Sequence, residues 1–415
     1  MNAAYLKDAE SLVLKLMAIP GVSGRENKVM EYIAGQLHKA GAPKNAVQFD
    51  NVHRRGRKGD RSNLPERPGG CCAQIGPVPF SPGGEVGNLV LRLPGTLPGK
   101  RRLLMAHVDT VPICEGTRPV RRGRYIVPAD KNTGLGADNR AGTAVVLSAA
   151  LEILRRGLPR PPLTFLWTVQ EEIGLRGSRF GRLGLLGNPR LAFNYDGGPA
   201  SKLTVAATGG YRMDIRVIGR ASHAGVSPEL GVSAITIASL AIAQLHREGW
   251  HGRIEKGNRT GTSNVGVIHG GQATNVVTEE VLLRAEARSH NSTFRRRIIR
   301  AIEQAFQKAA RSVRNVEGLR GEVQIDGRLD YESFRLRDDE PCVLAAEEAV
   351  SECGGTPVRA VSNGGLDANW MTVRGIPTVT LGCGQENVHT TSERLYLDEF
   401  RRACRIALRL ATGSE

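Results

Sequence analysis

Hydrophobic residues recur at helical spacing near the start of the chain and later gather in short apolar runs. The spacing predicts amphipathic helices over residues 4–17 and 26–40, and a third over 139–157 that stops at Gly157. The runs GNLVLRLPG, RRLLMAH, LTFLWTVQ and LAFNYD predict strands. Because strands and helices alternate, an α/β domain with a largely parallel sheet is favoured.

The pattern changes near residue 211. YRMDIRVIG predicts a strand, GVSAITIASLAIAQLHREG a helix, TSNVGVIHG and VVTEEVLLRAEARS two strands, residues 294–313 a helix, and EVQIDGRLDY a last strand. This β-α-β-β-α-β order is that of a ferredoxin-like α+β layer. At 415 residues the chain is also long for a single core. We therefore predict one domain from residues 1–210 and 323–415, with a second, 211–322, inserted in it.

Residues 53–84 are rich in Gly, Pro and Arg and carry no periodicity, which predicts an inserted surface loop. No stretch approaches the roughly 20 apolar residues that span a bilayer, and the first residues do not resemble a signal peptide. The seven cysteines include no CxxC pair. Neither a disulfide framework nor a thiolate zinc site is therefore indicated, and we expect a cytoplasmic protein without a membrane partner.

The net charge of +16 raises the question of a nucleic-acid partner. Aromatic residues make up only 5% of the chain and do not alternate with the basic clusters, which disfavours base stacking. We therefore assign most of this charge to solvated faces. Anionic substrates and weak polyanion binding stay open as alternatives.

A histidine and an aspartate follow the apolar run in LLMAHVDTVP. His107 and Asp109 are one residue apart, so in an extended chain they project to the same side. Asp109 can then accept the second ring N–H of His107 and fix its tautomer, as carboxylates do for metal-bound histidines. An ordinary structural pair is the alternative.

Asp138 stands where the glycine-rich stretch TGLG gives way to a predicted helix. Its carboxylate could cap the helix, or it could bridge two cations because its two oxygens have lone pairs for both. Glu171 and Glu172 follow a predicted strand as adjacent like charges, which raise each other's pKa. A division of tasks would explain the pair, with one carboxylate on a metal and the other suited to proton transfer. A solvated acidic turn is the alternative.

Asp196 in FNYDGG and His389 in QENVHTTSE also follow predicted strands, and each alone fits an ordinary turn or loop. Together the donors form a set of two histidines and three carboxylates near strand ends: His107, Asp138, Glu172, Asp196 and His389. This set suits borderline divalent metals, above all zinc. A bridging carboxylate with two further ligands per ion predicts an open two-metal site that hydrolyses amides.

These motifs resemble the zinc-dependent M20 metallopeptidase family, in particular its tripeptidase (peptidase T-like) branch. The resemblance covers nearly the whole chain outside residues 53–84 and runs through AHVDTVP, LGADNRAG, TVQEEIGLRGS, FNYDGG, GRASHAGVSPELGVSAI, ATNVVTEEV, NGGLDANW and GIPTVTLGCGQENVHTTSE. It implies a zinc-peptidase domain with a mostly parallel sheet flanked by helices. It also implies that the inserted ferredoxin-like domain is a lid and a homodimerisation surface.

The resemblance further implies two zinc ions per subunit, which Co²⁺ or Mn²⁺ can replace. Asp138 would bridge the two ions. His107 and Asp196 would complete the coordination of one ion, and Glu172 and His389 that of the other.

The other roles also follow from the resemblance. Glu171 would be the general base that takes a proton from the metal-bound water and passes it to the leaving amine, and Asp109 would orient the first histidine ligand. His223, in the SHAG motif of the lid, would stabilise the oxyanion, often in the partner's active site. Asn275 and Arg288 would bind the substrate carboxylate, for which Arg has a bidentate geometry.

The resulting prediction is a di-zinc metallopeptidase acting on short peptides, in particular a tripeptidase-like aminopeptidase. A deacylase of N-acyl amino acids, or another small-molecule amidohydrolase, is the alternative within hydrolases. A non-catalytic metal-binding or polyanion-binding protein is the alternative of another class, and the net charge of +16 motivates it. The presence of Glu171 beside a full ligand set argues against that class, since a binding protein has no need of a base.

Overall fold

The structure is a computed structural model that describes residues 3–54 and 83–413, so most of the predicted loop 53–84 lies outside the described residues. The chain divides into unit 1, Met1–Ala207 with Arg335–Glu415, and unit 2, Thr208–Phe334. The predicted second junction, at 322/323, is wrong. Strand β13 (Glu322–Tyr331) pairs with β9 (Gly209–Ile218) of unit 2, which moves the junction to 334/335.

Unit 1 is built on a central sheet of nine strands among the described residues, in the order β1-β2-β6-β3-β7-β16-β8-β14 with β15 beside β8. The pairs β6–β3, β3–β7, β7–β16 and β8–β15 are parallel, while β1–β2, β2–β6 and β8–β16 are antiparallel. The strands are Val47–Phe49 (β1), Leu89–Leu93 (β2), Arg102–His107 (β3), Leu163–Thr168 (β6), Leu191–Tyr195 (β7), Lys202–Ala207 (β8), Phe334–Arg335 (β14), Val358–Ser362 (β15) and Thr378–Leu381 (β16). The predicted mostly parallel sheet is confirmed.

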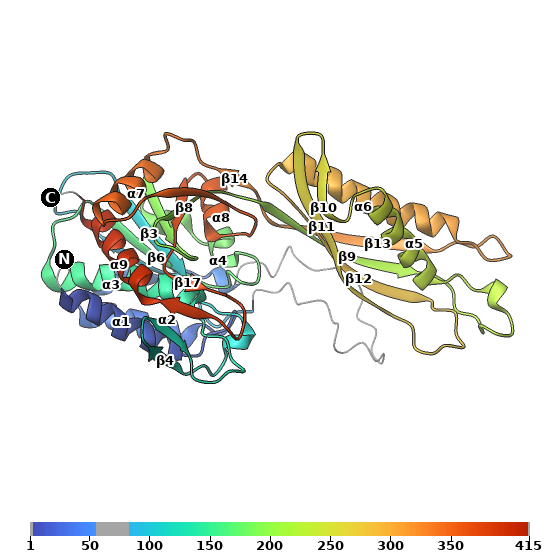
Figure 1. Cartoon of the computed structure of the whole chain (residues 1–415), viewed down its shortest axis with the longest axis horizontal. Helices are drawn as coiled ribbons and strands as arrows, with labels where there is room; N and C mark the ends of the chain where they lie inside the picture. Colours follow the sequence, from blue (N-terminus) through green and yellow to red (C-terminus); the bar gives the residue numbers. More distant parts are fainter. Residues whose placement is uncertain (1–2, 55–82, 414–415) are drawn as a thin grey trace. The chain divides into compact units, whose positions relative to one another are not determined.

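Helices cover both faces of this sheet, which suits a parallel core whose strands are apolar on both sides. Helices α1, α3 and α9 contact one another, and α3 and α9 also contact β3 (Figure 1). On the other face, Leu103 and Met105 of β3 pack with Met371 of α8. The helices of unit 1 are Ala3–Ala18 (α1), Asn27–Lys39 (α2), Ala137–Arg156 (α3), Arg176–Phe180 (α4), Pro341–Glu352 (α7), Asp367–Val373 (α8) and Leu397–Thr412 (α9), with 3-10 turns Lys44–Ala46 (η1), Val52–Arg54 (η2), Pro112–Cys114 (η3) and Leu183–Leu186 (η4).

A second, antiparallel sheet of unit 1 has the order β17-β18-β5-β4. Its strands are Pro119–Arg122 (β4), Tyr125–Pro128 (β5), Gln385–Glu386 (β17) and Arg394–Tyr396 (β18). Because β18 pairs with β5, the segment around residue 389 is held beside the segment that leads to α3. The sequence patterns did not predict this small sheet.

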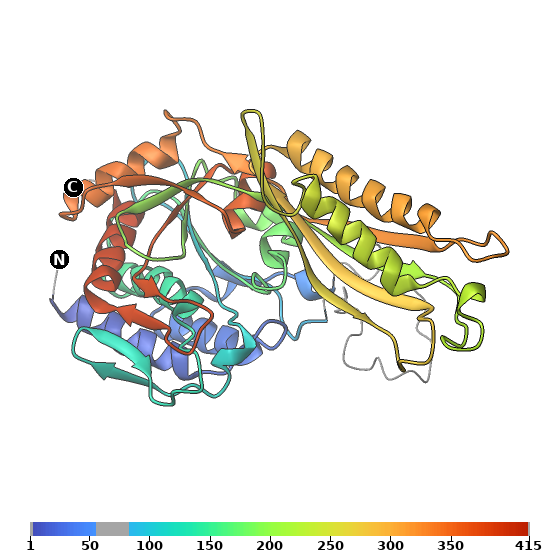
Figure 2. The ribbon, with the colours of Figure 1, turned by 45° about the vertical axis from the view of Figure 1, so that its right-hand side comes forward.

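Unit 2 is an antiparallel sheet in the order β10-β11-β12-β9-β13, with α5 and α6 side by side along one of its faces (Figure 2). Its elements are Gly209–Ile218 (β9), Pro228–Leu230 (η5), Ala234–Arg247 (α5), Gly252–Lys256 (β10), Arg259–Gly270 (β11), Glu280–Ser289 (β12), Ser292–Ser312 (α6) and Glu322–Tyr331 (β13). Side chains of Ser233 and Asn291 cap the two helices by accepting backbone N–H groups. The predicted β-α-β-β-α-β order is present, with β10 as an additional edge strand.

In the part of the chain that the structure describes, no helix is long and apolar enough to cross a membrane.

Candidate functional site

The chemistry-bearing residues of unit 1 follow the carboxyl ends of three neighbouring parallel strands. His107 ends β3, the pair Glu171–Glu172 comes shortly after β6, and Asp196 follows β7 directly. In the sheet, β3 lies between β6 and β7. Adjacent parallel strands end at the same edge, where sites of open α/β sheets form, so these side chains meet there.

The described residues of unit 1 contain three overlapping groups of donors that could hold a metal ion. In each group, one ligand atom per residue lies within 4.8 Å of the others. The groups are His107 with Asp138 and Asp196, Asp138 with Glu172 and His389, and His107 with Glu171 and Glu172. The first two share only Asp138, which therefore stands where a bridging ligand would.

The carboxylate of Asp138 points at both histidines. Oδ1 is 3.2 Å from Nε2 of His107, and Oδ2 is 3.2 Å from Nε2 of His389. Helix α3 is kinked at Asp138 and Asn139, and it is the side chain of Asn139 that accepts the Gly142 N–H at 2.9 Å, so the alternative role of Asp138 as a helix cap is not supported. Oδ1 is buried and has no hydrogen-bond partner of good geometry among the described residues. An acceptor oxygen left facing a ring nitrogen fits a cation held between the two atoms.

Asp109 is fully buried, and its carboxylate contacts both the ring of His107 and the backbone of the Glu171–Glu172 pair. Its Oδ1 lies 3.3 Å from Nδ1 of His107 and accepts the Glu171 N–H at 3.0 Å. Its Oδ2 accepts the Glu172 N–H at 3.1 Å and the Ser23 hydroxyl at 2.6 Å. One carboxylate thus fixes both the imidazole and the turn that carries the two glutamates.

Glu171 and Glu172 are both largely buried but differ in their contacts. Burial raises the pKa of Glu171 well above its usual range, although His107 nearby opposes this shift. Burial also raises the pKa of Glu172, while its contact with His389, 3.0 Å from Oε1 to Nε2, opposes the shift. Glu171 is 8% exposed, so a solvated acidic turn does not describe it.

The remaining predicted ligands have pKa values displaced by the same cluster. Burial raises the pKa of Asp196, and the nearby Asp138 carboxylate adds to the effect. Hydrogen bonds to Asp138 and Glu172 raise the pKa of His389 to about 10. Burial alone would raise the pKa of Asp138, but the nearby imidazoles of His107 and His389 outweigh burial and lower it. These pKa shifts arise because the donor side chains lie close to one another. A divalent cation bound among them would take the place of the protons that they hold.

His223 and Asn275 lie in neighbouring exposed loops of unit 2. The carbonyl of Asn275 accepts the Ala224 N–H at 2.8 Å, which joins the two loops. Nδ1 of His223 accepts the N–H groups of Gly225 and Val226, each at 3.1 Å. This turn places the proton of the neutral ring on Nε2, the arrangement that an oxyanion donor needs.

Arg288 lies at the other end of β12 from this pair of loops. Asn275 precedes the strand, which begins at Glu280, and the stretch from Glu280 to Arg288 spans about 26 Å. The guanidinium donates to Glu286 through Nε at 3.0 Å and Nη2 at 2.9 Å. The structure therefore does not bring Arg288 together with His223 and Asn275, and its guanidinium already holds a carboxylate.

Sequence reasoning assigned no role to two buried carboxyls near the donors. Asp367, in the motif NGGLDANW, accepts the Thr168 hydroxyl on Oδ2, and its buried Oδ1 has no partner among the described residues. Burial raises the pKa of Asp367. Glu393, four residues after His389, is 1% exposed and accepts backbone N–H groups at the start of α3. Both residues lie in motifs that carry the family resemblance, but their contacts with distant segments cannot be inferred from the sequence.

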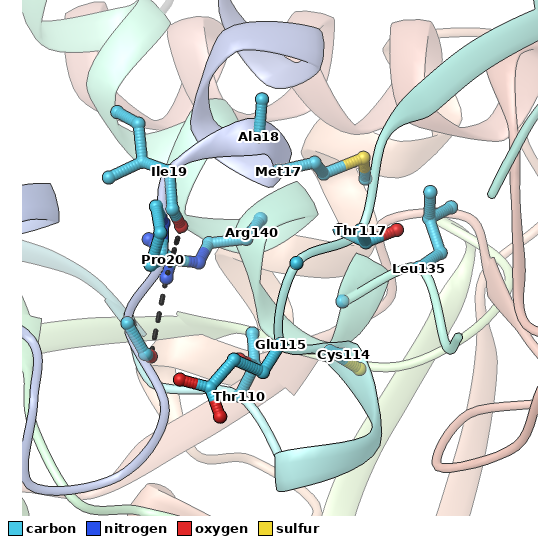
Figure 3. Close-up of a pocket in the computed structure, with 13 residues that line it drawn as sticks. Met17, Ala18, Ile19, Pro20, Thr110, Cys114, Glu115, Thr117, Leu135 and Arg140 are labelled. Atoms are coloured by element: carbon cyan, nitrogen blue, oxygen red, sulfur yellow. Dashed lines mark hydrogen bonds between the residues drawn. The ribbon is translucent and has the colours of Figure 1, made fainter. Parts of the chain in front are cut away.

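A small pocket behind the segment that precedes α3 contains none of the predicted ligands (Figure 3). Leu135, Gly136 and Cys114 form part of its wall, and Arg140 lies on the opposite side, 1% exposed. Nη2 of Arg140 donates to the carbonyl of Ile19 at 3.2 Å and to that of Gly21 at 3.3 Å. The guanidinium thereby holds the end of α1 against α3.

Comparison with known proteins identifies the family of this chain. The sequence model of peptidase family M20/M25/M40 matches residues 103–413. The uncharacterized protein YqjE of Bacillus subtilis is 34% identical over 319 residues, which are 77% of this chain and 82% of that protein. A tripeptidase from Staphylococcus aureus superposes with a TM-score of 0.83 at 27% identity, and aminopeptidase PepT from Bacillus cereus with 0.79 at 28%; in both cases 98% of each chain is covered.

The two structural matches confirm the predicted resemblance to the tripeptidase branch. The family model covers most of the chain and begins within β3, just before the first of the donor residues. The chain therefore belongs to peptidase family M20/M25/M40 and is a hydrolase of peptide bonds.

Proposed function

We propose that this chain is a two-metal aminopeptidase that cleaves short peptides, with zinc as its metal. The shared position of Asp138 carries the proposal, since its two oxygens face His107 and His389, members of two different donor groups. Two nitrogen and three oxygen donors suit zinc, and Co²⁺ or Mn²⁺ accept the same set. Asp138 would hold both ions, His107 and Asp196 one of them, and Glu172 and His389 the other.

Bound here, the two cations supply an activated water at neutral pH and polarise the scissile carbonyl. Glu171 acts as the general base, because its buried carboxyl has a raised pKa and lies among the donors. It accepts a proton during attack and delivers it to the leaving amine. Asp109 keeps His107 and the Glu171 backbone in place.

His223 donates a hydrogen bond from Nε2 to the oxyanion that develops during attack. The proton position set by its turn supports this role. Asn275, in the adjoining loop, binds the substrate carboxylate in the same region of unit 2. Two guanidinium nitrogens of Arg288 already donate to Glu286, which makes it the weaker of the two predicted contacts.

Short peptides are the proposed substrates because the chain resembles a tripeptidase and PepT over 98% of its length. Unit 2 is the proposed lid and homodimerisation surface, by the resemblance of its motifs to the family's inserted domain. The five described cysteines are free thiols, which supports a reducing, cytoplasmic setting.

A substrate screen on zinc-loaded protein tests the proposal. The purified chain, with its metal content measured, is offered dipeptides, tripeptides, longer peptides and N-acyl amino acids. We expect two zinc ions per chain and release of the N-terminal residue from tripeptides. Cleavage of acyl amino acids alone would identify a deacylase, and two bound ions without any cleavage would identify a binding protein.

A further inference from the structure

We propose that Glu393 is a positioning residue that ties the segment presenting Asp138 to the segment presenting His389. The proposal rests on the two-metal function proposed above. It concerns how the chain holds two ligands that lie 251 positions apart in the sequence. Glu393 is 1% exposed and belongs to neither the predicted ligands nor the base.

The carboxylate of Glu393 accepts three backbone N–H groups at the start of α3. Oε2 accepts those of Leu135 and Gly136, each at 2.8 Å, and Oε1 accepts that of Asp138 at 3.0 Å. Cys114 adds its thiol, with 3.5 Å between Sγ and Oε2. Asp138 and Asn139 have non-helical backbone angles, so the regular helix follows them, and Glu393 binds the bent segment that precedes it.

The same glutamate is anchored within the segment that carries His389. Its backbone N–H donates to the Thr390 carbonyl at 3.2 Å, and Thr390 in turn donates from its hydroxyl to the Asn387 carbonyl at 2.7 Å. Asn387 and His389 both have left-handed backbone angles, with φ of 54° and 63°. Because few backbone conformations satisfy these angles, the turn couples the position of His389 to that of Glu393.

Packing and hydrogen bonding act together on the Asp138 segment. Leu135 and Gly136 are buried beside the small pocket of Figure 3, and a Cβ at Gly136 would lie 3.1 Å from Cγ2 of Thr110. Gly136 also has a left-handed φ of 74°. The hydrogen bonds to Glu393 add a directional restraint on the backbone that presents Asp138, whose Oδ2 lies 3.2 Å from Nε2 of His389.

Glu393→Gln tests the inference, because an amide replaces one acceptor oxygen with an NH₂ group that opposes the backbone N–H donors. Glu393→Asp keeps the charge but is one methylene shorter. Asp50→Asn is the matched control, since Asp50 is also buried and accepts the backbone N–H groups of Val52, Asn88 and Arg182. Asp50 belongs to none of the donor groups.

Three readouts are compared on the full chain: zinc affinity by competition with a chromophoric chelator, the visible absorption spectrum of the Co²⁺-loaded protein, and the thermal midpoint. We expect Glu393→Gln to weaken binding of one of the two ions about 10- to 100-fold and to change the Co²⁺ spectrum. Glu393→Asp should recover part of both. Asp50→Asn should lower the thermal midpoint while both metal readouts keep their wild-type values.

Two results would overturn the role of Glu393 alone. One is wild-type zinc affinity and Co²⁺ spectrum in Glu393→Gln. The other is an equal loss of affinity in Asp50→Asn at a matched loss of thermal midpoint, which would indicate general destabilisation. Wild-type protein that binds fewer than two ions would overturn the proposed function, and this inference with it.

Discussion

Asp109 accepts the backbone N–H of Glu171 on the same oxygen, Oδ1, that lies 3.3 Å from the imidazole of His107. Asp109 therefore restrains both a proposed ligand and the proposed base. A single buried carboxylate does both, and it also accepts the Glu172 N–H on its other oxygen. Substitution of Asp109 should therefore affect metal binding and turnover together.

Asp109→Asn should weaken zinc binding about 10- to 100-fold and lower kcat. The amide can no longer accept on both sides, so either the backbone N–H groups or the ring of His107 loses its partner. Zinc competition and steady-state kinetics at saturating zinc measure the two effects. Ser23→Ala, which removes only the hydroxyl donor to Asp109, should have a smaller effect on both. Wild-type affinity and kcat in Asp109→Asn would contradict the shared role.

Glu171→Ala should abolish turnover while two zinc ions stay bound. General acid–base catalysis contributes roughly 10²- to 10⁴-fold, so kcat should fall by at least that much. Metal analysis and single-turnover assays on the same sample provide the measurement. Substantial activity beside full zinc content would exclude Glu171 as the base.

His223→Ala should lower kcat about 10²- to 10³-fold without changing zinc affinity, since the lost donor acts on the oxyanion. If unit 2 serves the partner's site in a homodimer, mixing His223→Ala with Glu171→Ala under conditions of subunit exchange should restore activity. A mixed dimer would then contain one site with an intact Glu171 and an intact His223. Mixtures that stay as inactive as their components, despite verified exchange, would show that His223 acts within its own chain.

The stability of the metal-free protein should depend on pH through Glu26. Burial, with Asp109 as a second cause, raises the pKa of Glu26 from 4.5 to about 8. The folded state thus holds this proton more tightly than the unfolded state, and stability is lost as the pH rises from about 4.5 through about 8. In Glu26→Gln, the decrease in the free energy of unfolding over this pH range should be smaller by about 1–3 kcal/mol.

Urea unfolding in the presence of a chelator, at several values between pH 5 and 8.5, measures this difference. The chelator removes the pH dependence that metal binding itself would add. Glu31→Gln, at an exposed position of α2, the helix that directly follows Glu26, is the control and should retain the wild-type slope. Equal slopes in Glu26→Gln and wild type would contradict the raised pKa.

Three of the predicted ligands, His107, Glu172 and Asp196, follow apolar runs that predict strands. Strand ends at one edge of a parallel sheet converge, so these side chains could be expected near one another from the sequence. Asp138 stands at the start of a predicted helix and His389 in a loop, and the assignment of Asp196 and His389 depended most on their order along the chain and on the resemblance. The structure brings all five together.

What the sequence did not reveal depends on contacts between distant segments. Strand β10 buries only Ile254, so its pattern contains no apolar run to detect. The pairing of Glu393 with the backbone near Asp138 joins segments about 255 residues apart, and no local pattern encodes it. The junction at 334/335 follows from the pairing of β13 with β9, which the sequence pattern does not indicate. The ion pair of Arg288 with Glu286 was legible in principle, because residues two apart on a strand project to one side.

The second unit interrupts the first between Ala207 and Arg335. His389 and Glu393 are therefore made only after the entire insertion has left the ribosome, long after His107, Asp138 and Glu172. A growing chain therefore holds an incomplete set of the predicted donors until the segment around His389 has emerged, because domains generally fold as units in order of synthesis. The insertion separates the two parts of the proposed site in time as well as in sequence.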